Sequence, residues 1–357
     1  MRRRDVLTTV GLAAGACLNF PAPAVAQDIR RLTMVTDYPD GPGMLASAKR
    51  LAQTIADCSG GRIQIEVSAA GAVIRPLETF DAVAAGIADM FHSHIGYFEK
   101  KSPAFHFFSG VPFGFTAAEL FAWVHFGGGQ ELWDELSGAF AVKPLLSCST
   151  GPQMGGWFVR EVDTVEAFRG LRYRMAGPGA EVYRRLGAVV VMVPGDEIVQ
   201  SLQSGAIDAC EWIGPWLDTV MGLHKAASFY YQPGWHEPGT GLALGINRSV
   251  WESFDEGDRR LIEVAAAGEY AVSLAEFNTN NALALRRLRA DGVIDIRKFD
   301  DAVIRKFAEL SEDIVAGLGS GDDLSRRIYA SYLEFRALLR DWSDIAECGQ
   351  LRFGGSN

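Results

Sequence analysis

The first part of the chain alternates between segments that favour strands and segments that favour helices. Residues 62–68 place Ile63, Ile65 and Val67 on one side and polar side chains on the other, which predicts a half-buried strand. Further strands are predicted at residues 32–36 and 87–92, and helices at 44–57 and 76–85. Strands separated by helices in this way predict an α/β unit with parallel pairing.

The same order of strands and helices returns later in the chain. Strands are predicted at residues 171–175, 188–193 and 207–212, and helices at 178–186 and 196–204. Gly86 and Gly205 each follow a helix, where glycine can adopt the left-handed conformation that ends it. Asp89 and Asp208 each enter the next strand three residues later. This repeat predicts two similar α/β lobes, connected by crossing strands.

From about residue 254 the pattern becomes helical. Residues 254–290 and 300–345 form long helical stretches, with one short strand predicted at 293–297. The last stretch carries apolar side chains at helical spacing: Ile328, Tyr332, Phe335, Leu338, Leu339 and Trp342. We predict that this amphipathic helix packs against a lobe, and the alternative is a helix that binds a partner.

The N-terminus has the three parts of a secretory signal. Three arginines at residues 2–4 precede an apolar run, and small residues at 22–26 end in an A-x-A site. We therefore predict that residues 1–26 are a signal peptide and that the mature protein is soluble and periplasmic. The Arg3-Arg4 pair favours the twin-arginine route over an ordinary Sec signal, and a lipoprotein signal at Cys17 is less favoured.

The charge balance excludes two classes of partner. The 357 residues include 44 Asp and Glu against 34 Lys and Arg. Binding to nucleic acid or to an anionic lipid surface needs basic patches, which this composition does not favour. The length predicts two domains or lobes. After the signal, no run approaches the roughly 18 apolar residues of a membrane span.

Four cysteines follow the predicted signal: Cys58, Cys148, Cys210 and Cys348. In an oxidising compartment they could form two disulfides in three pairings. Their spacing contains no C-x-x-C, which argues against zinc or thioredoxin-like chemistry. A chain of this size can bury an adequate core without disulfides, so we predict buried free thiols.

Most enzyme motifs are missing from the sequence. It contains no G-x-S-x-G elbow, no Walker loop and no H-E-x-x-H. The glycines at residues 239–245 lead into a strand instead of a helix, so they do not predict a dinucleotide site. His92 and His94 alternate on one strand face, but a third metal ligand at matching spacing is missing. We therefore predict that both are polar residues with hydrogen-bond partners.

Four polar residues stand in bulky or glycine-rich surroundings: Gln153, Arg174, Glu211 and Glu237. Arg174 and Glu211 each end a predicted strand. In open α/β sheets, ligands bind just beyond the carboxyl ends of strands. Both side chains are therefore candidates for a binding site.

The segments around these residues carry a family resemblance. QMGGWF at 153–158, FRGLRYR at 168–174, DACEWIGP at 208–215 and GWHE at 234–237 resemble the solute-binding subunits of tripartite ATP-independent periplasmic (TRAP) transporters. PFGF at 112–115 and the GGG before LW at 127–133 also match, so the resemblance covers essentially the whole mature chain. It implies a two-lobed α/β fold of the type II-like periplasmic binding proteins, with hinge strands and long C-terminal helices.

The resemblance also divides the chain. Residues 27–150 and 239–275 correspond to the first lobe, and residues 151–238 to the second. Residues 276–357 correspond to a C-terminal helical region that packs on the lobes. In some members of the family these helices mediate a homodimer.

The function that the resemblance implies is transport, not catalysis. The most similar branch captures a small monocarboxylate, a 2-oxo acid such as pyruvate, or lactate, together with a metal ion, and delivers it to the membrane permease. The alternative is a periplasmic metal-assisted lyase or hydrolase with Glu237 as base. The missing nucleophile and base constellation argues against that enzyme.

For the carboxylate, the resemblance assigns Arg174. The planar fork of a buried guanidinium can donate two parallel hydrogen bonds to a carboxylate. Arg172, two residues away, is less favoured by family position, although periodicity alone does not separate the two. By resemblance the Tyr97 hydroxyl also reaches the carboxylate, and Tyr38 and Trp212 are candidate walls.

For the metal ion, the argument starts from Glu211 and Glu237. Two buried carboxylates beside an anionic substrate repel one another unless one of them is protonated. A hard cation removes the conflict, with oxygen ligands from both carboxylates, the Gln153 amide, the Trp212 backbone carbonyl and the substrate. By resemblance the ion is Na⁺ or Ca²⁺, and hard oxygen ligands argue against zinc or copper.

Three departures from the family pattern concern the substrate. This sequence has Tyr38 where related proteins often carry Trp, and Gly96 where they often carry Tyr. It also has Pro238-Gly239-Thr240 after Glu237. A larger or differently shaped 2-oxo acid is therefore a further candidate substrate.

Overall fold

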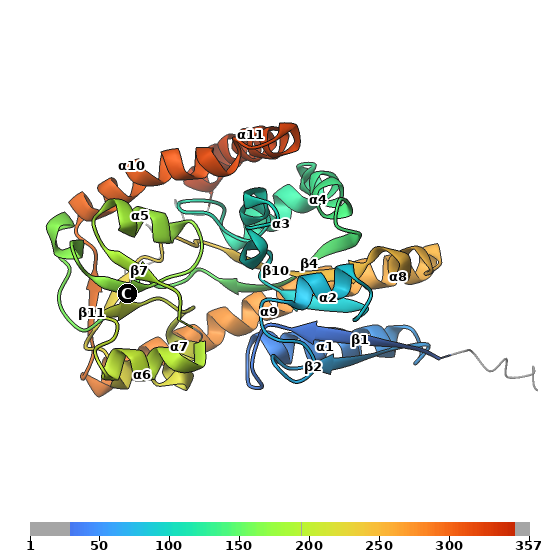
Figure 1. Cartoon of the computed structure of the whole chain (residues 1–357), viewed down its shortest axis with the longest axis horizontal. Helices are drawn as coiled ribbons and strands as arrows, with labels where there is room; N and C mark the ends of the chain where they lie inside the picture. Colours follow the sequence, from blue (N-terminus) through green and yellow to red (C-terminus); the bar gives the residue numbers. More distant parts are fainter. Residues whose placement is uncertain (1–28, 194, 347–357) are drawn as a thin grey trace, which may run out of the picture.

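The computed structural model describes residues 29–193 and 195–346 of the chain. Its strands form one five-stranded and one six-stranded sheet, with helices packed around them (Figure 1). This is the mixed α/β architecture that the alternating pattern predicts. The predicted signal peptide and Cys348 lie outside the described residues.

The five-stranded sheet has the order β2-β1-β3-β10-β4. Its strands are β1 (Arg30–Thr36), β2 (Ile63–Ser68), β3 (Met90–Ser93), β4 (Val142–Gly151) and β10 (Thr240–Asn247). Helices α1 (Met44–Cys58) and α2 (Thr79–Ala84) connect the first three strands. As predicted, β1 pairs in parallel with β2 and β3, whereas β10 runs antiparallel to β3 and β4.

The six-stranded sheet has the order β11-β9-β5-β8-β6-β7. Its strands are β5 (Gly156–Phe158), β6 (Arg172–Arg174), β7 (Val189–Val191), β8 (Ala209–Cys210), β9 (Phe229–Gln232) and β11 (Asp295–Lys298). Helices α5 (Gly179–Arg185) and α6 (Ile198–Gln203) connect its parallel strands, and α7 (Pro215–Met221) follows β8. The predicted parallel pairing of β6 with β7 and β8 is confirmed.

The repeated helix-to-strand junction is confirmed in its geometry. Gly86 has φ 73° and Gly205 has φ 70°, so both glycines end their helices in the left-handed region. Asp89 then accepts a hydrogen bond from the Thr33 backbone N–H at 2.7 Å, and Asp208 accepts one from the Arg172 N–H at 2.9 Å. In both sheets, the aspartate thus ties its own strand to the neighbouring parallel strand.

The molecule has a first half, built around the five-stranded sheet, and a second half, built around the six-stranded sheet. Long helices connect these two halves. Helix α9 (Glu256–Asp291) runs from the side of the first sheet to the second (Figure 1). Helix α10 (Asp301–Leu318) packs on α5, and α11 (Asp323–Ile345) packs on α3 (Ala117–Phe126) and α4 (Gly129–Gly138). A short helix, α8 (Arg248–Glu252), precedes α9. The limit predicted at residue 275 falls inside α9, and the lobe limits stay a prediction.

The packing of α11 agrees with its apolar spacing. Ile328 and Tyr332 are buried against the first half, and the Tyr332 hydroxyl accepts a hydrogen bond from the Phe115 N–H at 2.9 Å. Towards the end of the helix, Leu338 and Trp342 are exposed. The first part of α11 thus packs on the fold as predicted, and its last turns present apolar side chains to solvent.

The cysteine prediction holds for two residues and is wrong for a third. Cys148 and Cys210 are buried, but Cys58 is exposed, because the buried face of α1 ends at Ile55. Among the described residues, these three thiols form no disulfide with one another.

Two crossover segments, defined as residues 152–155 and 233–239, carry the chain between the sheets. The first connects β4 to β5 and the second connects β9 to β10. They touch: the Gln153 N–H donates to the Glu237 carbonyl at 3.3 Å. A Cβ on Gly234 would lie 2.1 Å from the Gln153 carbonyl oxygen, so only glycine allows this approach.

Candidate functional site

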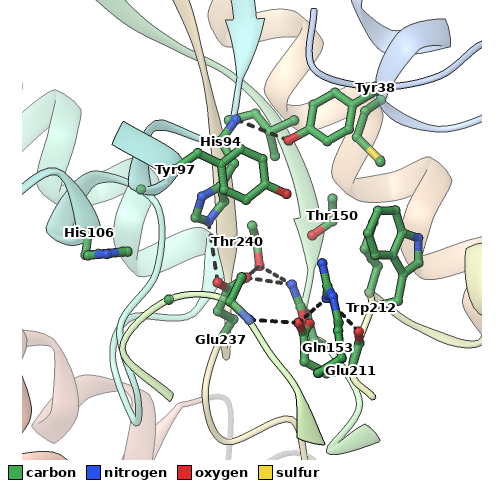
Figure 2. Close-up of a pocket in the computed structure, with 17 residues that line it drawn as sticks. Tyr38, His94, Tyr97, His106, Thr150, Gln153, Glu211, Trp212, Glu237 and Thr240 are labelled. Carbon is green, nitrogen blue, oxygen red and sulfur yellow. Dashed lines mark hydrogen bonds and ion pairs between the residues drawn. The ribbon is translucent and has the colours of Figure 1, made fainter. Parts of the chain in front are cut away.

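A pocket lies where the crossover segments meet the ends of the strands (Figure 2). It is lined by Tyr38, Met44, His94, Gly96, Tyr97, His106, Thr150, Gln153, Arg174, Ala176, Gly177, Glu211, Trp212, Ile213, Glu237, Thr240 and Leu242. All seven residues that the sequence nominates for the site are in this set. They come from both sheets, so the pocket is shared between the two halves.

Arg174 and Glu211 form a buried ion pair at the carboxyl ends of adjacent strands. Arg174 pairs with Cys210 in the parallel register of β6 and β8, which brings Glu211 beside it. Arg174 Nη1 donates to Glu211 Oε1 at 2.5 Å and to the Glu211 carbonyl at 2.9 Å. Nε donates to the Val193 carbonyl at 3.2 Å, and Nη2 takes part in none of these bonds. The guanidinium also lies over the Trp212 ring, 5.3 Å from its centroid.

Arg172 has a different environment from Arg174. Its side chain is exposed and forms an ion pair with Asp208 at 2.5 Å. Of the two arginines that periodicity leaves open, only Arg174 lines the pocket.

Glu237 is the centre of a second polar cluster. Gln153 Nε2 donates to Glu237 Oε2 at 2.6 Å, and the Thr240 hydroxyl donates to the same oxygen at 2.8 Å. The other amide atom, Gln153 Oε1, lies 3.0 Å from His236 Nε2. His94 Nε2 lies 3.5 Å from Glu237 Oε1, which is an ionic contact longer than an ordinary hydrogen bond.

The two carboxyl groups have opposite electrostatic situations. Burial raises the pKa of Glu211 to about 7, against the effect of Arg174 and with a further contribution from the negative charge of Glu237. Burial also acts to raise the pKa of Glu237, but His94, His236 and the Thr240 hydrogen bond together lower it to about 2. At neutral pH the pocket therefore holds more negative charge than Arg174 alone can balance.

Tyr38, Tyr97 and Trp212 line the pocket with their aromatic rings. Figure 2 shows Tyr38 and Tyr97 on one side of the pocket and Trp212 on another. The Tyr38 hydroxyl accepts a hydrogen bond from the His94 backbone N–H at 3.1 Å. The Tyr97 ring packs against the His94 ring, with centroids 4.9 Å apart. Burial raises the pKa of Tyr97, so its hydroxyl stays protonated at neutral pH.

The structure brings in polar residues that sequence reasoning missed. His94, His106, Thr150 and Thr240 line the pocket, and His236 supports Gln153. The position of Thr240, three residues after Glu237, is a local signal. His106 lies within an apolar run, PAFHFF, and gives no such signal.

The prediction that His92 and His94 have hydrogen-bond partners is wrong for His92, whose two ring nitrogens have none in the described part of the chain. His94 forms no ordinary hydrogen bond there, but its Nε2 has the 3.5 Å ionic contact with Glu237. His92 lies inside the core between β1 and β10, whereas His94 follows the end of β3 and reaches the pocket.

Residues 36–320 match a known family, described as bacterial extracellular solute-binding protein, family 7. The chain belongs to this family. Its members are transport solute-binding proteins and not enzymes, and they act outside the cytoplasm. Within residues 29–193 and 195–346, no helix is both long enough and apolar enough to span a membrane.

Individual relatives extend this assignment over the whole chain. The chain is 34% identical over 364 residues to the monocarboxylate 2-oxoacid-binding periplasmic protein of Nostoc sp., with 100% of both proteins covered. It superposes with a TM-score of 0.88, at 28% identity, on a TRAP solute-binding protein from Bordetella bronchiseptica, a mixed-occupancy dimer with calcium and picolinate; 92% of this chain and 97% of that one are covered. A TRAP solute-binding protein from Pseudoalteromonas atlantica with sodium and pyruvate gives 0.87 at 30% identity, with 91% and 99% covered.

The oxygen-rich pocket of this TRAP binding protein fits a hard cation. Glu211 and Glu237 bring carboxylate oxygens to one pocket, which Gln153 also lines, and such oxygens are the ligands that Na⁺ and Ca²⁺ require. Burial raises the pKa of Glu211 in spite of its ion pair with Arg174, so a further positive charge would stabilise the ionised carboxylate. A cation bound between the two carboxylates would supply that charge.

Proposed function

We propose that the chain is the periplasmic solute-binding subunit of a TRAP transporter. It captures a small monocarboxylate, a 2-oxo acid such as pyruvate, or lactate, together with Na⁺ or Ca²⁺, and delivers it to the membrane permease. The observation that carries the proposal is a buried guanidinium paired with the buried Glu211, in a pocket that the partly buried Glu237 also lines and that both sheets share. The ligands of the related proteins support the substrate class.

In this proposal, Arg174 holds the substrate carboxylate. Its Nη1 and Nε are occupied by protein oxygens, so the carboxylate takes the remaining N–H groups of the fork. The Tyr97 hydroxyl donates to the same carboxylate. Tyr38 and Trp212 close the sides of the pocket, and Gln153 contacts both substrate and ion.

The cation is needed because of charge. With substrate bound and Glu211 ionised, three negative charges, those of Glu211, Glu237 and the carboxylate, face the single positive charge of Arg174. In a low-dielectric pocket this imbalance is costly. A Ca²⁺ ion brings the four groups to neutrality, and Na⁺ leaves one net negative charge.

The proposed ion ligands are Glu211, Glu237, the Gln153 amide oxygen and the Trp212 backbone carbonyl. Gln153 currently directs its amide nitrogen to Glu237 and its oxygen towards His236. To bind the ion, the amide must turn over, so that Oε1 faces the carboxylates. We expect ion binding to be coupled to this turn.

Export and assembly complete the proposal. The Arg3-Arg4 pair directs the precursor to the twin-arginine route. A homodimer forms through the C-terminal helices, where α11 exposes Leu338, Trp342 and Ile345. The dimer of the Bordetella bronchiseptica protein supports this part.

Isothermal titration calorimetry of the mature protein tests the function. We expect saturable binding of pyruvate or lactate in Na⁺ or Ca²⁺, at least 10-fold weaker binding after chelation and sodium removal, and no product by NMR. Arg174→Gln should weaken binding by roughly 100-fold or more, because losing a buried charge partner costs about 2–5 kcal/mol. Arg172→Gln is the matched control on the same strand and should bind like the wild type. Turnover of the acid, or full affinity in Arg174→Gln, would contradict the proposal.

A further inference from the structure

Gly96 makes room for two histidine rings beside the pocket. It is the second residue of the 3-10 turn Ile95–Phe98, and this turn begins directly after His94. A Cβ at residue 96 would lie 2.6 Å from His106 Nδ1 and 2.7 Å from His94 Cε1. Any residue other than glycine would displace both rings, so Gly96 admits them to their present positions.

One edge of the His106 ring faces the pocket. The ring is only 1% exposed, and it comes from the 3-10 segment Pro103–Phe108. Its Nδ1–Cε1 edge is directed at two pocket-lining glycines: a Cβ on Gly96 would touch Nδ1, and a Cβ on Gly177 would lie 3.7 Å from Cε1. Gly177 follows β6 of the six-stranded sheet, whereas the His106 segment follows β3 of the five-stranded sheet, so this edge lies between the two halves.

Glu99 determines which nitrogen of His106 carries a proton. His106 Nε2 lies 2.9 Å from Glu99 Oε2, and this hydrogen bond is the main cause of the lowered pKa of Glu99. The ionised carboxylate can only accept, so Nε2 is the donor. In the neutral ring, Nδ1 is therefore an acceptor.

This acceptor has no partner among the described residues. Nδ1 of His106 is buried and forms no hydrogen bond to a protein group there. Leaving such an atom unpaired is unfavourable, and a ligand that donates a hydrogen bond to it gains affinity over one that does not.

We infer that His106 is a specificity-determining residue, whose Nδ1 accepts a hydrogen bond from a hydroxyl group on the carbon chain of the bound 2-oxo acid. The inference rests on the proposed function and narrows its substrate class to hydroxylated 2-oxo acids. Gly96 gives the ring its place, and Glu99 is a positioning residue that fixes its tautomer. Pyruvate, which has no hydroxyl donor, then binds more weakly than its 3-hydroxy derivative.

Calorimetry with pyruvate and 3-hydroxypyruvate, in the same Ca²⁺ or Na⁺ buffer, tests this inference. We expect the wild type to prefer 3-hydroxypyruvate by roughly 10-fold, which corresponds to one hydrogen bond to an otherwise unpaired buried acceptor. His106→Phe keeps a ring of similar size without the acceptor and should lose most of this preference. His125→Phe, which changes an exposed histidine on α3, should keep it.

Glu99→Gln is the second variant, because Glu99 is exposed and its exchange does not disturb the core. A glutamine at residue 99 can donate to Nε2 as well as accept from it, so the proton of the neutral His106 ring can lie on either nitrogen. This should reduce the preference for the hydroxylated acid. Long-range nitrogen NMR of the wild type should show the His106 proton on Nε2, and a mixture of tautomers in Glu99→Gln.

The outcomes separate the two proposals. Equal wild-type affinities for the two acids, or an unchanged affinity ratio in His106→Phe, would overturn the role of His106. The proposed function would still stand in that case, provided that pyruvate binds. No binding of either acid with Na⁺ or Ca²⁺ present would refute the proposed function as well. If His106→Phe fails to fold, the ratio in Glu99→Gln decides: a reduced ratio supports the inference and an unchanged ratio refutes it.

Discussion

His92 combines complete burial with two unpaired nitrogens. It lies in β3, opposite Thr36 of β1 and Leu244 of β10, with no hydrogen-bond partner among the described residues. Burial lowers the pKa of His92 to about 4, because the charged ring cannot be solvated there. The unfolded chain, with a pKa of about 6.5, therefore binds more protons than the folded chain between these two values. The contribution of His92 to stability is present above pH 6.5 and is lost as the pH falls towards 4.

We predict that His92→Phe makes the protein less sensitive to acid. From pH 7 to pH 5, the wild type should lose about 2 kcal/mol more of its free energy of unfolding than the variant, since each pH unit below 6.5 costs about 1.4 kcal/mol. Urea denaturation at a series of pH values measures this difference. Above pH 7 the two curves should run parallel, and parallel curves down to pH 5 would contradict the prediction.

At the residue scale, the sequence identifies the residues proposed to bind the ligand better than it identifies the residues that support them. Gln153, Arg174, Glu211 and Glu237 stand out because polar residues are rare in such apolar surroundings. The burial of Arg174, which Arg172 does not share, depends on Trp212 and the Val193 carbonyl, and no local pattern reports those contacts. His106 joins the pocket only because Gly96 leaves space for it, which is a tertiary contact.

At the element scale, the helix-ending glycines hold a left-handed backbone conformation that would be costly for any residue with a side chain. Gly205 has φ 70°, and a Cβ there would meet nothing within 4 Å, so a side chain would be strained only by its backbone. Gly268 is the opposite case: it lies within α9 with ordinary helical φ, and its Cβ position is also open. Exchanging each for alanine thus isolates the backbone effect.

We predict that Gly205→Ala and Gly268→Ala shift stability in opposite directions. Gly205→Ala should lower the free energy of unfolding by about 1–2 kcal/mol, the cost of the left-handed region for a residue with a Cβ. Gly268→Ala should raise it by about 0.5–1 kcal/mol, because alanine loses less conformational freedom in a helix. Chemical denaturation of both variants is the measurement, and a stabilised Gly205→Ala would contradict this account.

Elements formed by neighbouring residues were the easiest to predict. Strands β1, β2, β6 and β7 alternate with helices, and their parallel pairing follows from that order. Strands β5 and β9 pair antiparallel although 70 residues of chain separate them, and local periodicity does not reveal such a pairing. Local periodicity also does not reveal the contact between the crossover segments. That contact brings together Gln153, just before β5, and Gly234, just after β9.

At the scale of the whole molecule, α9 contributes to the cores of both halves. Ile262 and Ala266 pack with the first sheet, and Leu288 packs with Trp157 and Tyr230 of the second. Between them, Phe277 lies in a cluster with Tyr38, Leu217 and Trp216, next to the pocket. This position couples the packing of the helix to two walls of the proposed binding site.

Phe277→Ala should therefore reduce both stability and ligand binding. Phe277 is fully buried, so its truncation should cost about 3–5 kcal/mol of the free energy of unfolding. Loss of support for Tyr38 and the segment before Leu217 should also weaken pyruvate binding by roughly 10-fold, which is about 1.4 kcal/mol.

Phe168→Ala separates these two effects. Phe168 is equally buried, but it lies in the core of the second sheet, among Phe158, Tyr183 and Phe307. It should lose similar stability and keep the wild-type affinity in calorimetry below its melting temperature. If both variants lose affinity equally, the weakened binding follows from general instability. If only Phe277→Ala does, then α9 transmits its packing to the pocket, and a helix that belongs to both halves shapes the site between them.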